Sequence, residues 1–394
     1  MTIMRRSTPL FAAGSLAILL AGRGASAADC STLTGPLYVA GSSAIQTVVG
    51  EIGKVLAAEP TPDTTVVYVN AGSCVGVDAI LNGTPLSGTA LYWDSTGAQQ
   101  TCDLGAAPVA DVGVSDVFPS SCTPLPNGLP HDVGEFLGPV QAMTFIVPVA
   151  STQASISAEA AYCVYGLGDG SGVDPWTDVT TIFQRDATSG TQQMIAHAIG
   201  VDATRWKGTA TTSSGDMLAH VTGATNPESA MGVLVADVGE TNRATLRTLA
   251  YQHFDQSCGY YPDRDATSHE KQNVRDGHYA IWGPLHLLSK LNAQGYPVSP
   301  AARDVIGYIT GTKTPPGSLD LVALEAGGHV IPQCAMRVSR TEEAGPLASF
   351  APPGACGCYY DFVSDGATTC ASCINAGTCP SDAPVCSYGY CETQ

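Results

Sequence analysis

The sequence predicts a two-lobed α/β protein with a ligand cleft between its lobes, followed by a small disulfide-rich module. Three observations lead to this fold class. Strand-like and helical patterns alternate through most of the 394 residues. Two apolar runs, at 142–149 and 278–282, are placed to cross between lobes. Half of the 14 cysteines lie beyond residue 355, which indicates a separate stapled unit.

The N-terminus has the pattern of a secretory signal. Arg5 and Arg6 precede an apolar core at 10–21, and small residues follow at 25–27. The apolar core is too short to span a membrane, and no later segment is longer. We therefore expect residues 1–27 to be cleaved and the mature protein to be periplasmic or secreted, and not membrane-spanning.

The elements expected in the first lobe alternate between strand and helix. In order they are a strand at 36–39, a helix at 45–56, a strand at 64–69, a helix from 77 to 81, a hairpin insertion at 83–110 and a strand at 109–114. This order favours a mostly parallel sheet covered by helices.

The second lobe is expected between the two crossing runs. Residues 177–250 repeat the alternation of strand and helix. Helices predicted at 284–291 and 303–310 then return to the first lobe. A segment with three prolines follows and is typical of a linker. The expected boundaries are a signal at 1–27, the first lobe at 28–145 and 277–344, the second lobe at 146–276, a linker at 345–355 and a cysteine-rich module at 356–394.

The cysteines are expected to form disulfides, because the chain is predicted to be exported. Seven precede residue 335 and seven follow residue 355, so full pairing requires at least one bridge between body and tail. A Cys102–Cys122 bridge could staple the hairpin insertion. Cys74 is expected to be oxidised, with Cys30 as one candidate partner. The tail has no histidine, which favours disulfides over zinc there.

The charge of the chain excludes some partners. The formal net charge is −18, which argues against nucleic acid and anionic membranes. A small anion is still compatible with this charge if local dipoles hold it in a closed site.

Four turns that end predicted strands carry the candidate anion site. Where helices follow them, hydroxyls and free amide N–H groups would gather at the carboxyl ends of the strands. The turns are Gly41-Ser42-Ser43-Ala44-Ile45, Gly72-Ser73-Cys74-Val75-Gly76, Gly113-Val114-Ser115-Asp116 and Arg185-Asp186-Ala187-Thr188-Ser189-Gly190-Thr191. Arg185 adds a planar cation suited to phosphate or carboxylate.

These turns resemble, in order and type, those of the periplasmic phosphate-binding protein of phosphate ABC transporters. The resemblance covers most of residues 35–335 and is most specific in the last turn, where Arg185, Ser189, Gly190 and Thr191 match throughout. It implies a type 2 periplasmic-binding-protein clamshell that delivers phosphate to an ABC permease, with no catalytic step and no cofactor. The cysteine-rich module is additional to that family.

The resemblance also implies which residues bind phosphate. From the second lobe they are Arg185, Ser189, Gly190 and Thr191, and from the first lobe Ser43, Ala44, Ile45, Ser73 and Asp116. Ala44 stands where the family commonly has a hydroxyl, and Cys74 and Val75 replace small residues. Asp116 can only accept hydrogen bonds, so it is expected to select phosphate, which retains an O–H, over sulfate.

Two other functions fit parts of the sequence. The scaffold could serve an extracellular interaction or adhesion protein, with a degenerate anion site and the cysteine-rich tail on a partner. The turn around Cys74 also has the form of a nucleophile elbow, for which Asp116 and either His131 or His197 could complete a hydrolytic set.

Overall fold

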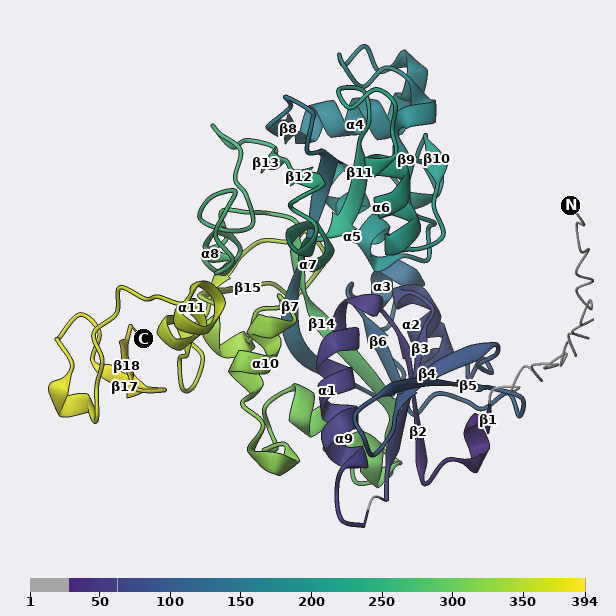
Figure 1. The fold of residues 1–394 in the computed structure, drawn as a ribbon, viewed down its shortest axis with the longest axis vertical. Coiled ribbons are helices and arrows are strands. Elements are labelled where there is room, and N and C mark those ends of the chain that lie inside the picture. The colour runs from purple at the N-terminus through teal and green to yellow at the C-terminus, as the bar shows by residue number, and fades with distance from the viewer. Residues whose placement is uncertain (1–27, 62, 394) are drawn as a thin grey trace, which may run out of the picture.

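A computed structural model describes residues 28–61 and 63–393, and the predicted signal at 1–27 lies outside them. Figure 1 shows two lobes with the C-terminal module at one side. The main sheet has ten strands. Nine of them lie side by side in one continuous order, and the tenth, β12, pairs with β7 outside that order. In spatial order the nine are β1 (Ala28–Asp29), β5 (Gln99–Asp103), β4 (Thr89–Trp93), β3 (Thr65–Asn70), β2 (Pro36–Gly41), β6 (Val112–Ser115), β14 (Trp282–Lys290), β7 (Val133–Pro148) and β11 (Gly232–Val235). Strand β12 spans Leu246–Thr248.

The first lobe contains β2, β3 and β6, which are parallel to one another. Helices α1 (Gln46–Ala57) and α2 (Ser73–Leu81) follow β2 and β3, as the sequence predicts. A Cβ on Gly76 of α2 would lie 2.6 Å from the Ala40 carbonyl oxygen and 2.7 Å from that of Val114. Only glycine therefore lets α2 lie this close to the sheet. The carboxyl ends of these strands then share one edge.

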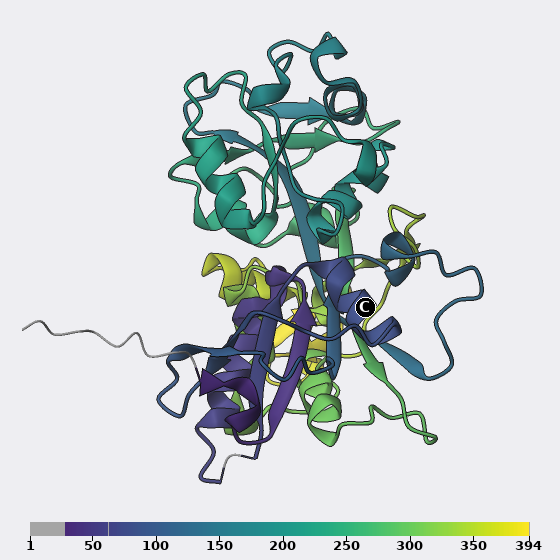
Figure 2. The same ribbon diagram turned by 90° about the vertical axis from the view of Figure 1, so that its right-hand side faces the viewer.

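Strands β7 and β14 carry the chain between the lobes. The first part of β7 pairs with β14, and its last residues pair with β11 and β12 of the second lobe. Figure 2 shows β7 running from one lobe into the other. The predicted helix at 284–291 is wrong, because residues 284–290 belong to β14. Both faces of β14 are buried, so its apolar run lacks the alternation that would have marked a strand.

The second lobe packs helices around β11. The helices are α4 (Ala158–Leu167), α5 (Gly190–Ile199), α6 (Ser214–Thr222) and α7 (Ala236–Thr241), and the short strands are β8 (Ser155–Ser157), β9 (Phe183–Gln184), β10 (Thr209–Ala210) and β13 (Ala250–Gln252). Within the stretch expected to alternate between strand and helix, residues 179–181 form a 3₁₀ turn, which the Asp178 side chain caps, and β9 follows it. One large apolar core joins this lobe to the crossing strands.

Four further helices complete the body: α3 (Pro119–Cys122), α8 (Gln272–Arg275), α9 (Pro300–Ile309) and α10 (Leu321–Gly327). Among the described residues, no helix is long and apolar enough to cross a membrane.

The disulfides of the body differ from the expected pairs. Cys30 bonds to Cys102, and Cys74 bonds to Cys122, so both suggested pairings are wrong. The parallel pairing of β1 with β5 brings Cys30 to Cys102. Cys74 lies in the first turn of α2, which packs against α3 and its last residue, Cys122. Cys74 is oxidised, as expected.

The tail is stapled to the body and within itself. It contains α11 (Gly357–Asp365), β17 (Val385–Ser387) and β18 (Tyr390–Glu392), and β15 (Val338–Ser339) pairs with β16 (Ala348–Ser349) ahead of it. Cys334–Cys356 is the expected bridge between body and tail. The other bridges join Cys358 to Cys370, Cys373 to Cys386 and Cys379 to Cys391.

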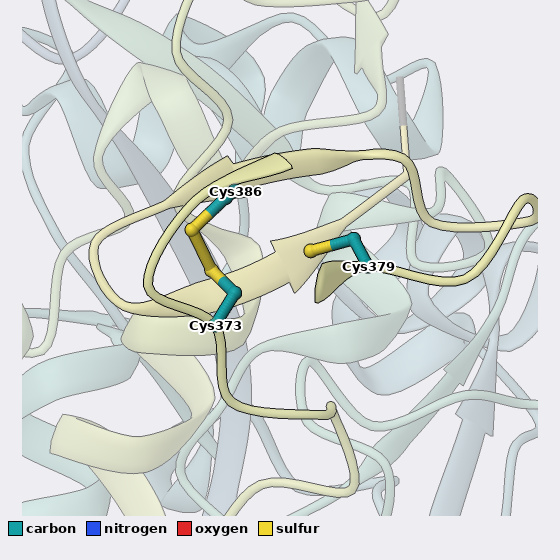
Figure 3. A group of neighbouring side chains, drawn as sticks. All are labelled: Cys373, Cys379 and Cys386. Atoms are coloured by element: carbon teal, nitrogen blue, oxygen red, sulfur yellow. A yellow bond between two sulfur atoms is a disulfide. The ribbon is translucent and has the colours of Figure 1, made fainter. Parts of the chain in front are cut away.

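Figure 3 shows Cys373, Cys379 and Cys386 with their sulfur atoms close together. A zinc site would need thiolates, whereas all three sulfurs are consumed in disulfides. The expectation of disulfides in the tail is therefore confirmed.

Candidate functional site

A cavity of about 240 Å³ lies where the two lobes meet. The ends of β2, β3 and β6 approach it from the first lobe, and the starts of α5 and α6 approach it from the second. Its lining residues are Ser42, Ser43, Asn70, Ala71, Gly72, Ser73, Asp116, Arg185, Asp186, Thr188, Ser189, Gly190, Thr191, Thr212, Ser213, Ser214 and Gly215. The lining is polar and comes from both lobes.

Asp116 is the acceptor at the first-lobe side of the cavity. Its side chain is 4% exposed. Oδ1 accepts a hydrogen bond from the Ser42 hydroxyl at 2.5 Å, and Oδ2 accepts one from the Ser73 hydroxyl at 3.0 Å. Burial raises the pKa of the Asp116 carboxyl, while these two hydrogen bonds oppose that shift. Desolvation dominates, so the ionised form of Asp116 is held at a cost in free energy.

Arg185 lies across the same cavity, directly after β9. Its Nη1 donates to the Ser214 hydroxyl at 3.2 Å, and its buried Nε has no partner among the described residues. Burial lowers the pKa of Arg185, while the charges of Asp186 and Asp116 raise it. A guanidinium remains protonated through this range of shifts, so Arg185 is a half-buried cation with donor capacity to spare.

The helix starts supply further donors. Helix α5 begins at Gly190 after the N-cap residue Ser189, whose hydroxyl makes no capping hydrogen bond. Ser189 and Thr191 are 4% and 5% exposed and both line the cavity. The first amide N–H groups of α5 have no acceptor within the helix and carry its positive dipole end. This end of α5 therefore has the hydroxyl and amide donors that an anion site requires.

The two lobes touch at the cavity. The Cys74 amide donates to the Thr188 carbonyl oxygen at 3.1 Å, which links α2 to the turn before α5. A Cβ on Gly190 would lie 2.2 Å from the Ser73 hydroxyl oxygen and 2.7 Å from Asp116 Oδ2. The glycine in the Ser-Gly-Thr turn is thus what lets the lobes approach this closely.

The structure brings together all but two of the predicted site residues. Ser43, Ser73, Asp116, Arg185, Ser189, Gly190 and Thr191 line the cavity. Ala44 and Ile45 do not: they are 5% and 0% exposed, and the Ala44 amide donates to the Ser42 hydroxyl at 3.0 Å. The Ala44 amide is used inside its own turn and is not turned toward the cavity.

Sequence reasoning missed two contributors to the site. Ser42 stands in the first turn beside the residues that were selected, and it is the one that bonds to Asp116. Ser214 stands in Thr212-Ser213-Ser214-Gly215, a hydroxyl-rich turn that opens α6. The same rule that singled out the other turns, hydroxyls directly before a helix, would have found it.

The hydrolase interpretation is wrong. Cys74 is bonded to Cys122 and has no thiolate to offer. His131 and His197, its suggested partners, are both exposed. None of these three residues lines the cavity.

No family model matches the sequence. No curated protein matches it significantly. Solved structures do match. One is described as a candidate phosphate ABC transporter substrate-binding protein with bound phosphate from Clostridium perfringens, at 14% identity and a TM-score of 0.50 over 76% of this chain and 99% of that one. An ABC-type phosphate transport receptor from Vibrio cholerae matches at 15% identity and a TM-score of 0.47, over 76% of this chain and 100% of that one.

A human phosphate-binding apolipoprotein is also similar, at 12% identity and a TM-score of 0.46, over 75% of this chain and 90% of that one. At these identities the likeness concerns the fold alone. The predicted fold class is confirmed: the chain has the two-lobed α/β fold of type 2 periplasmic binding proteins, with additional disulfides in its C-terminal region.

Proposed function

We propose that this protein captures inorganic phosphate, or a related tetrahedral oxyanion, in the cavity between its lobes. One observation carries the proposal: Arg185 from the second lobe and Asp116 from the first line the same cavity, among hydroxyls and helix starts. The residues that we propose bind the anion are the cavity residues Ser43, Ser73, Asp116, Arg185, Ser189, Gly190 and Thr191, together with Ser42 and Ser214.

The set of donors fits a dehydrated anion. Hydroxyls and helix amides supply partial positive charge, and Arg185 supplies a full one. Its buried Nε lacks a partner among the described residues, and a bound oxyanion would accept from it. A buried donor without an acceptor costs free energy, so filling this position favours binding.

Asp116 gives the site a preference between oxyanions. Phosphate keeps an O–H at neutral pH and can donate it to the carboxylate, whereas sulfate would bring an acceptor against an acceptor. An unpaired buried contact of that kind costs several kcal/mol, so discrimination of about 10³-fold or more is expected. This favours phosphate, and equally arsenate, over sulfate.

The wider role we propose is that of an exported solute-binding protein without a catalytic step, which passes phosphate to an ABC permease. The six disulfides fit an oxidising compartment outside the cytoplasm. The similar protein from Clostridium perfringens is described as holding phosphate, which supports the same ligand here.

Thermal unfolding of phosphate-free protein tests the proposal. Phosphate at about 100 times its Kd should stabilise the wild type by about 2.7 kcal/mol and raise the thermal midpoint accordingly. Arg185→Ala should abolish this shift while leaving the midpoint without phosphate nearly unchanged, because Arg185 has one side-chain hydrogen bond to the protein. A wild type that does not respond to phosphate would refute the proposal. A large fall in the midpoint of unliganded Arg185→Ala would mark Arg185 as structural.

A further inference from the structure

Glu343 reaches the back of the anion site from the segment between β15 and β16. Its Oε2 accepts a hydrogen bond from the Phe118 amide at 3.2 Å. Phe118 stands two residues after Asp116, in the same turn at the end of β6. The other carboxylate oxygen of Glu343, Oε1, is buried and has no partner among the described residues. A carboxylate that sequence reasoning assigned to no role is therefore bonded to the turn that carries Asp116.

The surroundings of Glu343 confirm how near it is to that turn. A Cβ on Gly283 of β14 would lie 3.3 Å from the Asp116 carbonyl oxygen and 3.8 Å from Glu343 Oε1. On the other side, the Phe118 ring packs against His286 with centroids 4.4 Å apart. Glu343 and His286 thus fix Phe118 from two directions.

Arg340 anchors the segment that presents Glu343. Its Nη1 donates to the carbonyl oxygens of Ala280 at 3.2 Å and Trp282 at 3.1 Å. Its guanidinium carbon lies 4.1 Å from the centroid of the Trp282 ring. Because Trp282 begins β14, which crosses between the lobes, Arg340 ties the segment that carries Glu343 to a crossing strand.

We propose that Glu343 is a positioning residue for the anion site, which holds the Asp116 turn in place and exchanges a proton when the anion binds. The proposal rests on the proposed function, because it assigns Glu343 a role at that same cavity. Glu343 does not line the cavity and acts through Phe118 and Asp116.

The charges around Glu343 give the sign of this coupling. Burial raises the pKa of Glu343 to about 7, and the negative charge of Asp116 adds to the increase. The Phe118 amide and the Arg340 cation oppose it. On the far side of Phe118, His286 Nδ1 lies 2.6 Å from Glu135 Oε1.

A bound anion adds a further negative charge, which raises the pKa of Glu343 again. Binding near neutral pH is then accompanied by proton uptake, and the Glu343 contribution to affinity is lost as the pH rises above its pKa.

The test compares wild type with Glu343→Gln by phosphate calorimetry in two buffers of different protonation enthalpy, at about pH 7.5. Glutamine keeps an oxygen for the Phe118 amide but does not titrate. The variant should bind phosphate with smaller proton uptake and a flatter pH profile than wild type. The matched control is Glu342→Gln, whose side chain is exposed, and it should behave as wild type.

A second variant removes the hydrogen bond as well as the charge. Glu343→Ala leaves the Phe118 amide without its acceptor and should weaken phosphate binding by about tenfold, an effect that Glu343→Gln restores. Equal proton uptake and equal pH profiles in wild type and Glu343→Gln would overturn the role of Glu343 while leaving phosphate capture intact. A wild type that binds no phosphate would overturn both proposals.

Discussion

Asp116 is enclosed by two serine hydroxyls, whose hydrogen bonds oppose the increase in pKa that burial causes. The lone pairs not taken by Ser42 and Ser73 are the part of Asp116 that remains for a ligand. In the site we propose, selectivity would depend on this one carboxylate, whereas affinity would be shared among Arg185, hydroxyls and helix amides.

Replacing Asp116 by asparagine should reduce the preference of the site for phosphate over sulfate. An amide offers a donor to sulfate, so discrimination between phosphate and sulfate should fall from about 10³-fold to about tenfold or less. Acid should act in the same direction in the wild type, because Asp116 becomes a donor as the pH falls below its raised pKa. Competition titrations of phosphate against sulfate at several pH values would measure both effects. Unchanged selectivity in Asp116→Asn would assign discrimination to other residues.

The start of α5 is where the second lobe meets the first lobe at the cavity. Gly190 lies against Ser73 and Asp116 at distances that leave no room for a Cβ. The Cys74–Thr188 hydrogen bond forms at the same contact. The contact between the lobes at the cavity therefore depends on these few atoms.

Gly190→Ala should prevent closure without unfolding the protein. Alanine favours helix, so the midpoint of the unliganded variant should not fall, but phosphate affinity should drop by about 10- to 100-fold because of the clash. Gly327→Ala in α10 is the control, since a Cβ there meets no atom within 4 Å. Calorimetry measures the phosphate affinity of both variants. Wild-type affinity in Gly190→Ala would show that phosphate binding does not require this contact.

At the scale of elements, the sequence predicted the turns that line the cavity better than it predicted the second crossing strand. The turns were recognisable because hydroxyls and glycines precede helices in the sequence, and the structure places the same residues at helix starts. The run at 284–291 was not recognisable as a strand, because a strand buried on both faces and a buried helix are both continuously apolar. The approach of Glu343 to Phe118 joins residues 225 positions apart, and no local pattern reports such a contact.

Over the whole molecule, the C-terminal module contacts two separate parts of the body. The hydroxyl of Tyr359 in α11 donates to Asp320, the N-cap residue of α10, at 2.5 Å. Asp361 of the same helix pairs with Arg275, which is 2% exposed. Asp365 accepts from the His269 amide at 2.8 Å.

The segment that α11 contacts is itself tied to the second lobe. Lys271, beside His269, pairs with Glu240 of α7 and with Asp263 at 3.0 Å. Helix α11 thus contacts α10 of the first lobe and a segment bonded to the second lobe. We infer that α11 limits how far the lobes separate.

Removing the bridge between body and module should loosen this attachment. Cys334→Ala with Cys356→Ala opens a bridge between positions 22 residues apart and should lower the free energy of unfolding by about 2–4 kcal/mol. The control is Cys373→Ala with Cys386→Ala, which opens a bridge inside the module. Denaturant unfolding measures both. Equal losses of stability in the two double variants would show that the module does not support the body.

Calorimetry of the phosphate-free wild type is the direct measurement of whether the interlobe cavity captures phosphate. At micromolar protein, phosphate should give saturating heat with a single ion per chain. Sulfate should bind at least about 10³-fold more weakly, because it cannot donate to Asp116. No heat with phosphate, or equal binding of sulfate, would contradict the account.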